Sequence, residues 1–223
     1  MNEKYAVLFD LDGTLLNTLD DLVNAVNHIL EKYGFPKRKT EDVRRFLGNG
    51  ARDLMQRSLP SGVVGERFED ILNEYKQYYS EHSKICTKPY DGVIDALSRL
   101  KELGIRTAIV SNKPDEAVAI LGKEYFGELI DFSVGDRPGI RIKPAPDPLF
   151  YVAKNLGCEK YVFVGDSETD VAAAKNADVP CVSVTWGFRD RDVLLEAGAE
   201  IFADSAEEML SEILKLFGMN GEI

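Results

Sequence analysis

The sequence predicts an α/β fold in which helices cover a doubly wound parallel β-sheet and a helical domain is inserted after the first strand. Four short apolar segments, at 5–9, 107–111, 162–165 and 181–185, alternate with helical patterns, as in a parallel sheet. Between the first segment and a helix that begins near Gly92, roughly 75 residues show no strand, although a crossover needs only one helix. An inserted helical domain accounts for this excess.

The first strand is followed at once by two carboxylates, in the pentad Asp10-Leu11-Asp12-Gly13-Thr14. Residues two apart on an extended chain face the same side, so Asp10 and Asp12 can serve one centre, and Gly13 permits a sharp exit from the strand. Open α/β sheets bind ligands at this end of their strands. A calcium loop fits poorly, because leucine and aspartate stand at its glycine and glutamate positions. A solvated turn is the simpler alternative for the pentad alone.

Residues 17–84 form the expected helical insert, which leaves 1–16 and 85–223 as the α/β core. A capping box from Thr18 and Asp21 is expected to begin its first helix. The first and last helices each show an apolar stripe that is typical of a packed core. These stripes consist of Leu19, Leu22, Val23, Val26, Ile29, Leu30 and Tyr33, and of Phe68, Ile71, Leu72, Tyr75 and Tyr79.

Two further polar segments follow the insert. The strand at 107–111 ends in Ser111 and Asn112, whose hydroxyl and backbone N–H groups suit phosphate oxygens, although a Ser-Asn turn before a helix is the commoner reading of such a segment alone. Lys143 lies in a loop stiffened by prolines, which fix its approach, just before a helix through Val152. A lone loop lysine is usually a surface residue.

A second carboxylate pair follows the strand at 162–165. Asp170 comes about one helical turn after Asp166, so Asp166 can face a metal ion from the strand end while Asp170 orients its neighbours. Capping of the following helix by Asp166 or Ser167 is the alternative.

The order of these groups along the chain resembles the haloacid dehalogenase superfamily of phosphohydrolases. Asp10-Leu11-Asp12-Gly13-Thr14 resembles its first motif, and the other three are matched by Ser111, by Lys143, and by Gly165-Asp166 with Asp170. The resemblance spans nearly the whole chain and implies a Rossmann-like core. It also identifies the insert as the helical cap of the superfamily's first cap type, hinged near 14–18 and 82–90, which can close and exclude water.

The resemblance implies a role for each motif residue. Asp10 attacks phosphorus to form an aspartyl-phosphate, and Asp12 protonates the leaving oxygen and later takes a proton from water. Mg²⁺ is expected on Asp10, the Asp12 backbone carbonyl and Asp166, with support from Asp170. The phosphoryl group is expected to be held by Lys143 and Ser111, with further phosphate contacts from Gly13, Thr14 and Asn112.

The segment 43–54 resembles the specificity loop of bacterial phosphoglycolate phosphatases. Its turn, Gly48-Asn49-Gly50, opens a helix and can offer N–H groups to a small anion, and Arg52 in the first turn can pair with a substrate carboxylate. A plain turn between helices is the alternative. We therefore expect Mg²⁺-dependent hydrolysis of a small phosphate monoester, with 2-phosphoglycolate as the first candidate.

Other functions stay open at this stage. A pyrophosphatase or a β-phosphoglucomutase would share the motif chemistry and differ in contacts from the insert. A non-enzymatic phosphoaspartate switch or binding protein is disfavoured, because Asp12 would hasten dephosphorylation, and Asp12 also favours phosphate esters over carbon–halogen bonds. Two residues depart from the phosphatase pattern: Asn17 replaces an aspartate, and Asp178 replaces a turn glycine, where aspartate tolerates a left-handed backbone.

Composition bounds the partners. The net charge of −11 argues against nucleic acid, which is bound through basic patches. Neither an apolar run of about 18 residues nor a secretory signal is seen, so we expect a cytoplasmic protein without a membrane partner. The 3 cysteines lack metal-ligand spacing, and His28 and His82 receive no role. The expected partner is a small phosphorylated metabolite, and the expected state is a monomer or small homo-oligomer.

Overall fold

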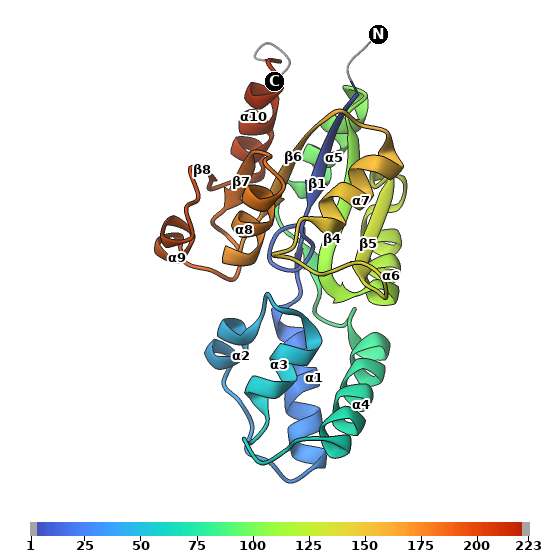
Figure 1. Cartoon of the computed structure of the whole chain (residues 1–223), viewed down its shortest axis with the longest axis vertical. Helices are drawn as coiled ribbons and strands as arrows, with labels where there is room; N and C mark the ends of the chain where they lie inside the picture. The colour runs from blue at the N-terminus through green and yellow to red at the C-terminus, as the bar shows by residue number, and fades with distance from the viewer. Residues whose placement is uncertain (1–3, 220–223) are drawn as a thin grey trace.

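Six parallel strands form the sheet at the centre of the larger lobe in Figure 1. The computed structural model describes residues 4–219. The strands are β1 (Tyr5–Phe9), β4 (Arg106–Pro114), β5 (Phe132–Asp136), β6 (Lys160–Gly165), β7 (Cys181–Val184) and β8 (Ile201–Ala203). Their order in the sheet is β5-β4-β1-β6-β7-β8, so the chain builds outward from β1 first on one side and then on the other. The predicted doubly wound α/β fold is confirmed.

Helices cover both faces of the sheet because β1 is apolar on both. Val7 and Phe9 pack in a core with α5 (Val93–Glu102), α6 (Asp115–Phe126) and α10 (Ala206–Leu216). Ala6 and Leu8 face the other way, toward α7 (Asp147–Leu156) and α8 (Glu168–Asn176). This alternation follows from the two-residue period of a strand. The remaining elements of this lobe are the short helices η1 (Gly127–Leu129) and α9 (Arg191–Glu196).

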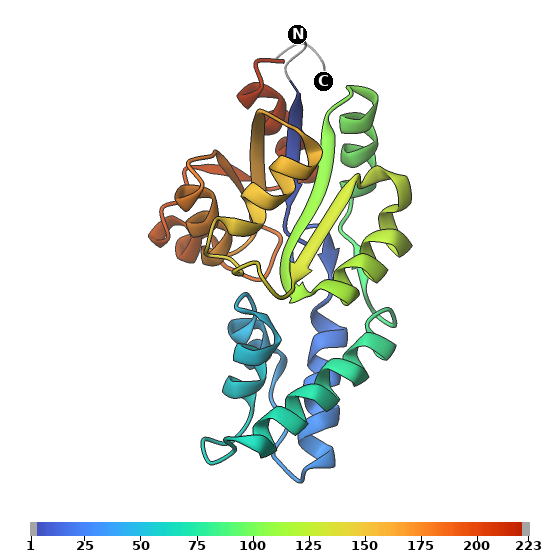
Figure 2. The same cartoon turned by 45° about the vertical axis from the view of Figure 1, so that its right-hand side comes forward.

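Four helices form the smaller lobe, which lies beyond the carboxyl edge of the sheet in Figures 1 and 2. They are α1 (Leu19–Lys32), α2 (Thr40–Phe46), α3 (Gly50–Ser58) and α4 (Glu66–His82), and we call them the helical insert. The predicted stripes on α1 and α4 pack into an apolar core of the insert, with Leu19 and Tyr33 partly buried at its border, and Phe188 joins this core from the loop after β7. The domain boundaries at 16/17 and 84/85 stay a prediction.

Two short strands connect the lobes. In this connection, β2 (Leu16–Asn17) pairs antiparallel with β3 (Lys88–Pro89). The carboxylate of Asp21, in the first turn of α1, accepts hydrogen bonds from the backbone N–H groups of Cys86 and Thr87 and from the Thr87 hydroxyl. The two connections are therefore tied to each other.

The capping box expected at Thr18 and Asp21 is wrong. Thr18 does precede α1, but its hydroxyl donates to Asp12 at 2.7 Å instead of accepting from the helix. The Asp21 carboxylate is taken by the second connection. Tertiary partners have therefore replaced the local ones.

Asp178, which stands where the phosphatase pattern has a turn glycine, has a φ of 56°. This is the left-handed conformation that aspartate tolerates.

No helix within residues 4–219 is long and apolar enough to cross a membrane.

Candidate active site

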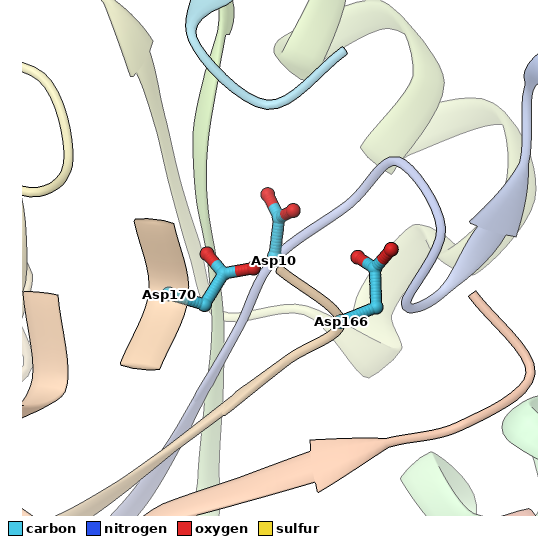
Figure 3. A group of neighbouring side chains, drawn as sticks. All are labelled: Asp10, Asp166 and Asp170. Atoms are coloured by element: carbon cyan, nitrogen blue, oxygen red, sulfur yellow. The ribbon is translucent and has the colours of Figure 1, made fainter. Parts of the chain in front are cut away.

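Three carboxylates meet at the carboxyl edge of the sheet. Asp10 follows β1, Asp166 follows β6, and Asp170 lies in the first turn of α8, and all three are buried. One oxygen from each lies within 4.8 Å of the others. Figure 3 shows Asp10 between Asp166 and Asp170. The edge of the sheet therefore brings together residues that are 160 positions apart in the sequence, because β1 and β6 are neighbours in the sheet.

Lys143 lies among these carboxylates. Its side chain is 2 % exposed, and its Nζ lies 2.8 Å from Asp10 Oδ1 and 2.7 Å from Asp170 Oδ1. The Asn112 side chain holds the lysine loop, since its Nδ2 donates to the Lys143 carbonyl and its Oδ1 accepts from the Lys143 N–H, both at 2.8 Å. Asn112 thus fixes the lysine backbone from the end of β4.

The Asp166 carboxylate accepts two hydrogen bonds and lies against the backbone of Gly13. Its Oδ1 accepts from the Thr14 hydroxyl at 3.0 Å, and its Oδ2 accepts from the Phe188 N–H at 2.7 Å. The loop after β1 passes so near that a Cβ on Gly13 would overlap this carboxylate, and the φ of Gly13 is +89°. Only glycine fits there without strain.

Asp170 has two structural roles at once. Its Oδ1 contacts Lys143, while its Oδ2 accepts from the backbone N–H and the hydroxyl of Ser167, at 3.0 and 2.6 Å. Ser167 in turn caps α8, so the two residues form a capping box. The capping alternative considered for this segment is therefore met by Ser167, and it coexists with the lysine contact.

The cluster contains three carboxyl groups and one ammonium group, that of Lys143, so the ammonium does not balance three ionised carboxylates. Burial raises the pKa of Asp10, Lys143 lowers it, and the charges of Asp170 and Asp12 raise it again, which together bring it to about 7. Burial, with the nearby Asp10 and Asp170, raises the pKa of Asp166 well above its usual value. Burial lowers the pKa of Lys143, but Asp10 and Asp170 outweigh it, and the net shift is upward.

This donor set fits a hard divalent cation. The three carboxylates offer only oxygen ligands, which Mg²⁺ prefers, and a cation there would offset the charge that one lysine does not balance. Asp10 and Asp166 are the better ligands of the three. Each Asp166 oxygen accepts one hydrogen bond, whereas Asp170 accepts three, from the Lys143 ammonium and from the N–H and hydroxyl of Ser167. Asp170 is therefore placed to support the other two carboxylates.

Asp12 has a partner that sequence reasoning missed. Lys113 Nζ lies 2.7 and 2.9 Å from the two Asp12 carboxylate oxygens, and the Thr18 hydroxyl donates to Asp12 Oδ1. Lys113 directly follows the Ser111-Asn112 pair, so its place at the end of β4 was the available signal. The contact from Thr18 links Asp12 to the connection between the lobes.

A cavity of about 390 Å³ lies between the sheet edge and the helical insert. It is lined by eight of the predicted site residues: Asp10, Asp12, Ser111, Asn112, Lys143, Asp166, Gly48 and Gly50. Within residues 4–219, five other predicted residues do not line this cavity: Gly13, Thr14, Asn49, Arg52 and Asp170. Thr14 and Gly13 instead contact or adjoin Asp166.

Arg52 points to a partner within the insert. Its guanidinium makes two hydrogen bonds to the Glu69 carboxylate, at 2.7 and 2.8 Å, and lies over the ring of Phe68. The side chain is 59 % exposed. In this conformation Arg52 does not reach the cavity, and its pairing with a substrate carboxylate stays a prediction.

Arg189 is a second residue that sequence reasoning missed. It follows β7, pairs with Glu168, and donates to the backbone carbonyls of Arg44 and Leu47 at 3.0 and 2.5 Å. Asn112 adds a hydrogen bond to the Gly48 carbonyl at 2.9 Å. Arg189 and Asn112 of the larger lobe thus hold the segment from the end of α2 to the start of α3 through backbone carbonyl groups of that segment. Because every residue has such a carbonyl group, the sequence of the segment does not indicate these contacts.

The fold and this site place the chain among enzymes with a doubly wound α/β sheet whose active site lies at the carboxyl edge. Residues 7–184 match the family model described as haloacid dehalogenase-like hydrolase, and the chain belongs to that family.

Relatives with known names span most of the chain. It is 36% identical over 212 residues to phosphoglycolate phosphatase 1 of Pseudomonas aeruginosa, across 92% of this chain and 78% of the relative. A structure from Lactobacillus delbrueckii subsp. bulgaricus, provisionally named a phosphoglycolate phosphatase, matches with a TM-score of 0.88 and 34% identity, over 93% of this chain and 97% of the other. CbbY from Rhodobacter sphaeroides, solved with phosphate, matches with a TM-score of 0.76 and 25% identity, over 92% and 95%.

Proposed function

We propose that the protein is a Mg²⁺-dependent phosphatase that hydrolyses a small phosphate monoester through an aspartyl-phosphate on Asp10. The observation that carries this proposal is the buried cluster in which Lys143 contacts Asp10 and Asp170 while Asp166 lies within 4.8 Å. The names of the relatives support 2-phosphoglycolate as the first candidate substrate. The phosphate complex of CbbY supports a phosphoryl group as the bound moiety.

Asp10 is the nucleophile in this proposal. A carboxylate oxygen attacks phosphorus, the bond from phosphorus to the leaving oxygen breaks, and an acyl phosphate forms on Asp10. Lys143, 2.8 Å from Asp10, and Ser111 would hold the phosphoryl oxygens as charge shifts toward the leaving group. Asp10, Asp166 and the backbone carbonyl of Asp12 would hold Mg²⁺, which offsets the repulsion between carboxylate and phosphate when bound.

Asp12 is the general acid and base. It lines the cavity two residues beyond Asp10, and it would give its proton to the leaving oxygen and later take one from the water that attacks the acyl phosphate. Lys113 and Thr18 hold its carboxylate in place. Covalent capture in this way divides one difficult step into two easier ones.

The helical insert closes the site and limits substrate size. A cavity of about 390 Å³ is near the lower end of the range for small-ligand sites, which favours a compact metabolite. The loop at Gly48-Asn49-Gly50 and Arg52 keep their proposed part in substrate binding. The proposed enzyme is cytoplasmic and works as a monomer or a small homo-oligomer.

A substrate panel tests the proposal. Release of phosphate from 2-phosphoglycolate, pyrophosphate and sugar phosphates is measured with Mg²⁺ and with excess EDTA. We expect the highest kcat/KM on 2-phosphoglycolate and loss of all turnover in EDTA. A higher value on pyrophosphate would replace the phosphatase by a pyrophosphatase, and conversion of a sugar phosphate to its isomer would replace it by a mutase. A phosphoenzyme that forms but does not turn over would indicate a switch.

A further inference from the structure

The wall that α4 contributes to the cavity contains a buried hydroxyl group without a partner. Tyr79 lines the cavity, and the residue is 3 % exposed. Within residues 4–219 its hydroxyl makes no hydrogen bond. Because leaving a buried polar group unpaired is costly, such a group in a binding cavity is explained most simply by a ligand that pairs with it.

A buried cation contacts both the Tyr79 ring and Asp12. The Lys113 side chain is 4 % exposed, and its Nζ is 4.5 Å from the centroid of the Tyr79 ring. Two of its three N–H donors are taken by the Asp12 carboxylate, at 2.7 and 2.9 Å. An ammonium group has three donors, so one is left for a ligand in the cavity.

The other cations that line the cavity are committed elsewhere. Lys143 contacts Asp10 and Asp170 and is assigned to the phosphoryl group in the proposed function, and Arg189 contacts Glu168 and two backbone carbonyls. Lys76 is exposed to solvent. Arg52, which the sequence favours for a substrate carboxylate, is bound to Glu69 outside the cavity lining. Lys113 is thus the buried cation that can meet a second anionic group.

We infer that Lys113 and Tyr79 form a subsite for a carboxylate on the leaving group of the substrate. The inference rests on the proposed phosphatase function and specifies its substrate class: phosphate monoesters whose alcohol carries a carboxylate near the ester oxygen. It gives that carboxylate to Lys113 and Tyr79 instead of to Arg52, which is bound to Glu69. Lys113 touches Asp12, and Asp12 must reach the leaving oxygen, so an anion on Lys113 lies only a few atoms from that oxygen. A carboxylate one carbon away satisfies this geometry, and the Tyr79 hydroxyl donates to it.

The subsite is tested by pairing one conservative variant with two substrates. Tyr79→Phe removes only the hydroxyl, and 2-phosphoglycolate is compared with ethyl phosphate, which has the same chain length and no carboxylate. We expect Tyr79→Phe to lower kcat/KM on 2-phosphoglycolate by about tenfold, mainly through KM, as for one hydrogen bond to a charged group. Ethyl phosphate should be hydrolysed equally well by both proteins. Lys113→Met should reduce the kcat/KM on 2-phosphoglycolate relative to that on ethyl phosphate further than Tyr79→Phe does.

The matched control is Tyr78→Phe on the same helix. The Tyr78 ring is stacked between His28 and His82, with centroids 3.8 and 3.9 Å away, and it does not line the cavity, so neither substrate should respond to this change. The inference is overturned if Tyr79→Phe affects both substrates alike or neither. It is also overturned, with the phosphatase proposal intact, if the wild-type protein shows no preference for 2-phosphoglycolate over ethyl phosphate. Failure to hydrolyse any phosphate ester would instead overturn the proposed function.

Discussion

At Asp10, burial and charge combine to set the chemistry of a single side chain. Burial and two neighbouring carboxylates raise its pKa to about 7, while Lys143 at 2.8 Å favours the ionised form. Such a competition is typical of functional groups rather than of structural ion pairs on a surface. The residue is therefore the first target for mutation.

Asp10→Asn should abolish turnover without unfolding the protein. The amide keeps the shape of the side chain and can still accept from Lys143, but it is not a nucleophile. We expect kcat to fall by at least about a thousandfold, with circular dichroism and Tm close to wild type. Residual turnover above that level in a folded variant would remove the proposed role of Asp10.

Gly13→Ala should damage the site through Asp166. A Cβ there would overlap the Asp166 carboxylate, and the residue has a φ of +89°. We expect a loss of about 1–3 kcal/mol in the free energy of unfolding and a higher Mg²⁺ concentration for half-maximal activity. Gly34→Ala is the matched control, since Gly34 also has a positive φ, of +71°, but nothing lies within 4 Å of its Cβ position. Equal effects of both variants on Mg²⁺ dependence would contradict this account.

The residues that meet at the sheet edge were predictable from sequence, whereas their partners were not. Asp10, Lys143, Asp166 and Asp170 each follow or precede a regular element at the same sheet edge, so pattern and spacing found them. Lys113 also stands at this edge, at the end of β4, but its contact with Asp12 depends on where Asp12 lies in space. Thr14 and Asn112 were expected on phosphate, and the structure gives them contacts to Asp166 and Lys143; a phosphate contact for either stays a prediction.

At the scale of elements, the loop between α2 and α3 depends on the larger lobe. Arg189 donates to the carbonyls of Arg44 and Leu47, and Asn112 donates to that of Gly48. These carbonyl groups belong to the last turn of α2 and the turn after it, where the Arg44 carbonyl also accepts from the Leu47 N–H. The loop is thereby held over the cavity.

Arg189→Ala should loosen this loop without touching the carboxylate cluster. We expect kcat/KM to fall by about tenfold and the amides of residues 47–50 to exchange hydrogen faster. Arg191→Ala is the matched control, because Arg191 is exposed and pairs with Asp204 away from the loop. Unchanged exchange in Arg189→Ala would show that Arg189 does not hold the loop.

Element prediction succeeded where the periodic pattern was long or continuous. The buried strands β1, β4, β6 and β7 and the amphipathic helices α1 and α4 were expected close to their observed bounds. The strands β5 and β8 were not expected, because β5 ends in a glycine and an aspartate and β8 has only 3 residues. Both lie at the edges of the sheet, where neighbouring strands rather than local pattern define them.

At the scale of the whole molecule, the two lobes meet around one charged centre. The tie from Asp21 to Cys86 and Thr87 joins the two connections, and the Thr18 hydroxyl extends from one of them to Asp12. Movement of the helical insert would therefore also move a partner of the proposed acid. Sequence alone indicated the insert and its approximate position, but it did not indicate these contacts. Asp21 and Thr87 are more than 60 positions apart in the sequence. The Thr18 hydroxyl is near Asp12 in the sequence, but the fold decides that it donates to Asp12 and does not cap its own helix.

Mg²⁺ should stabilise the folded protein. Three buried carboxylates cluster here and two of them contact Lys143, so there is negative charge for a cation to offset. A cation bound only by the folded state adds free energy of about 2.7 kcal/mol at a hundred times its Kd. For a chain of this size we expect Tm to rise by several degrees. Asp166→Asn should lose most of this rise. A rise of equal size in the variant, or with NaCl at matched ionic strength, would place the cation elsewhere.

The most direct test of the central claim is to trap the acyl phosphate. The protein is mixed with Mg²⁺ and 2-phosphoglycolate, quenched in acid within the first turnover, digested and analysed by tandem mass spectrometry. We predict one added phosphoryl group on Asp10, absent without Mg²⁺ and absent in Asp10→Asn. Full turnover with the phosphoryl group on another residue, or on none, would contradict the account.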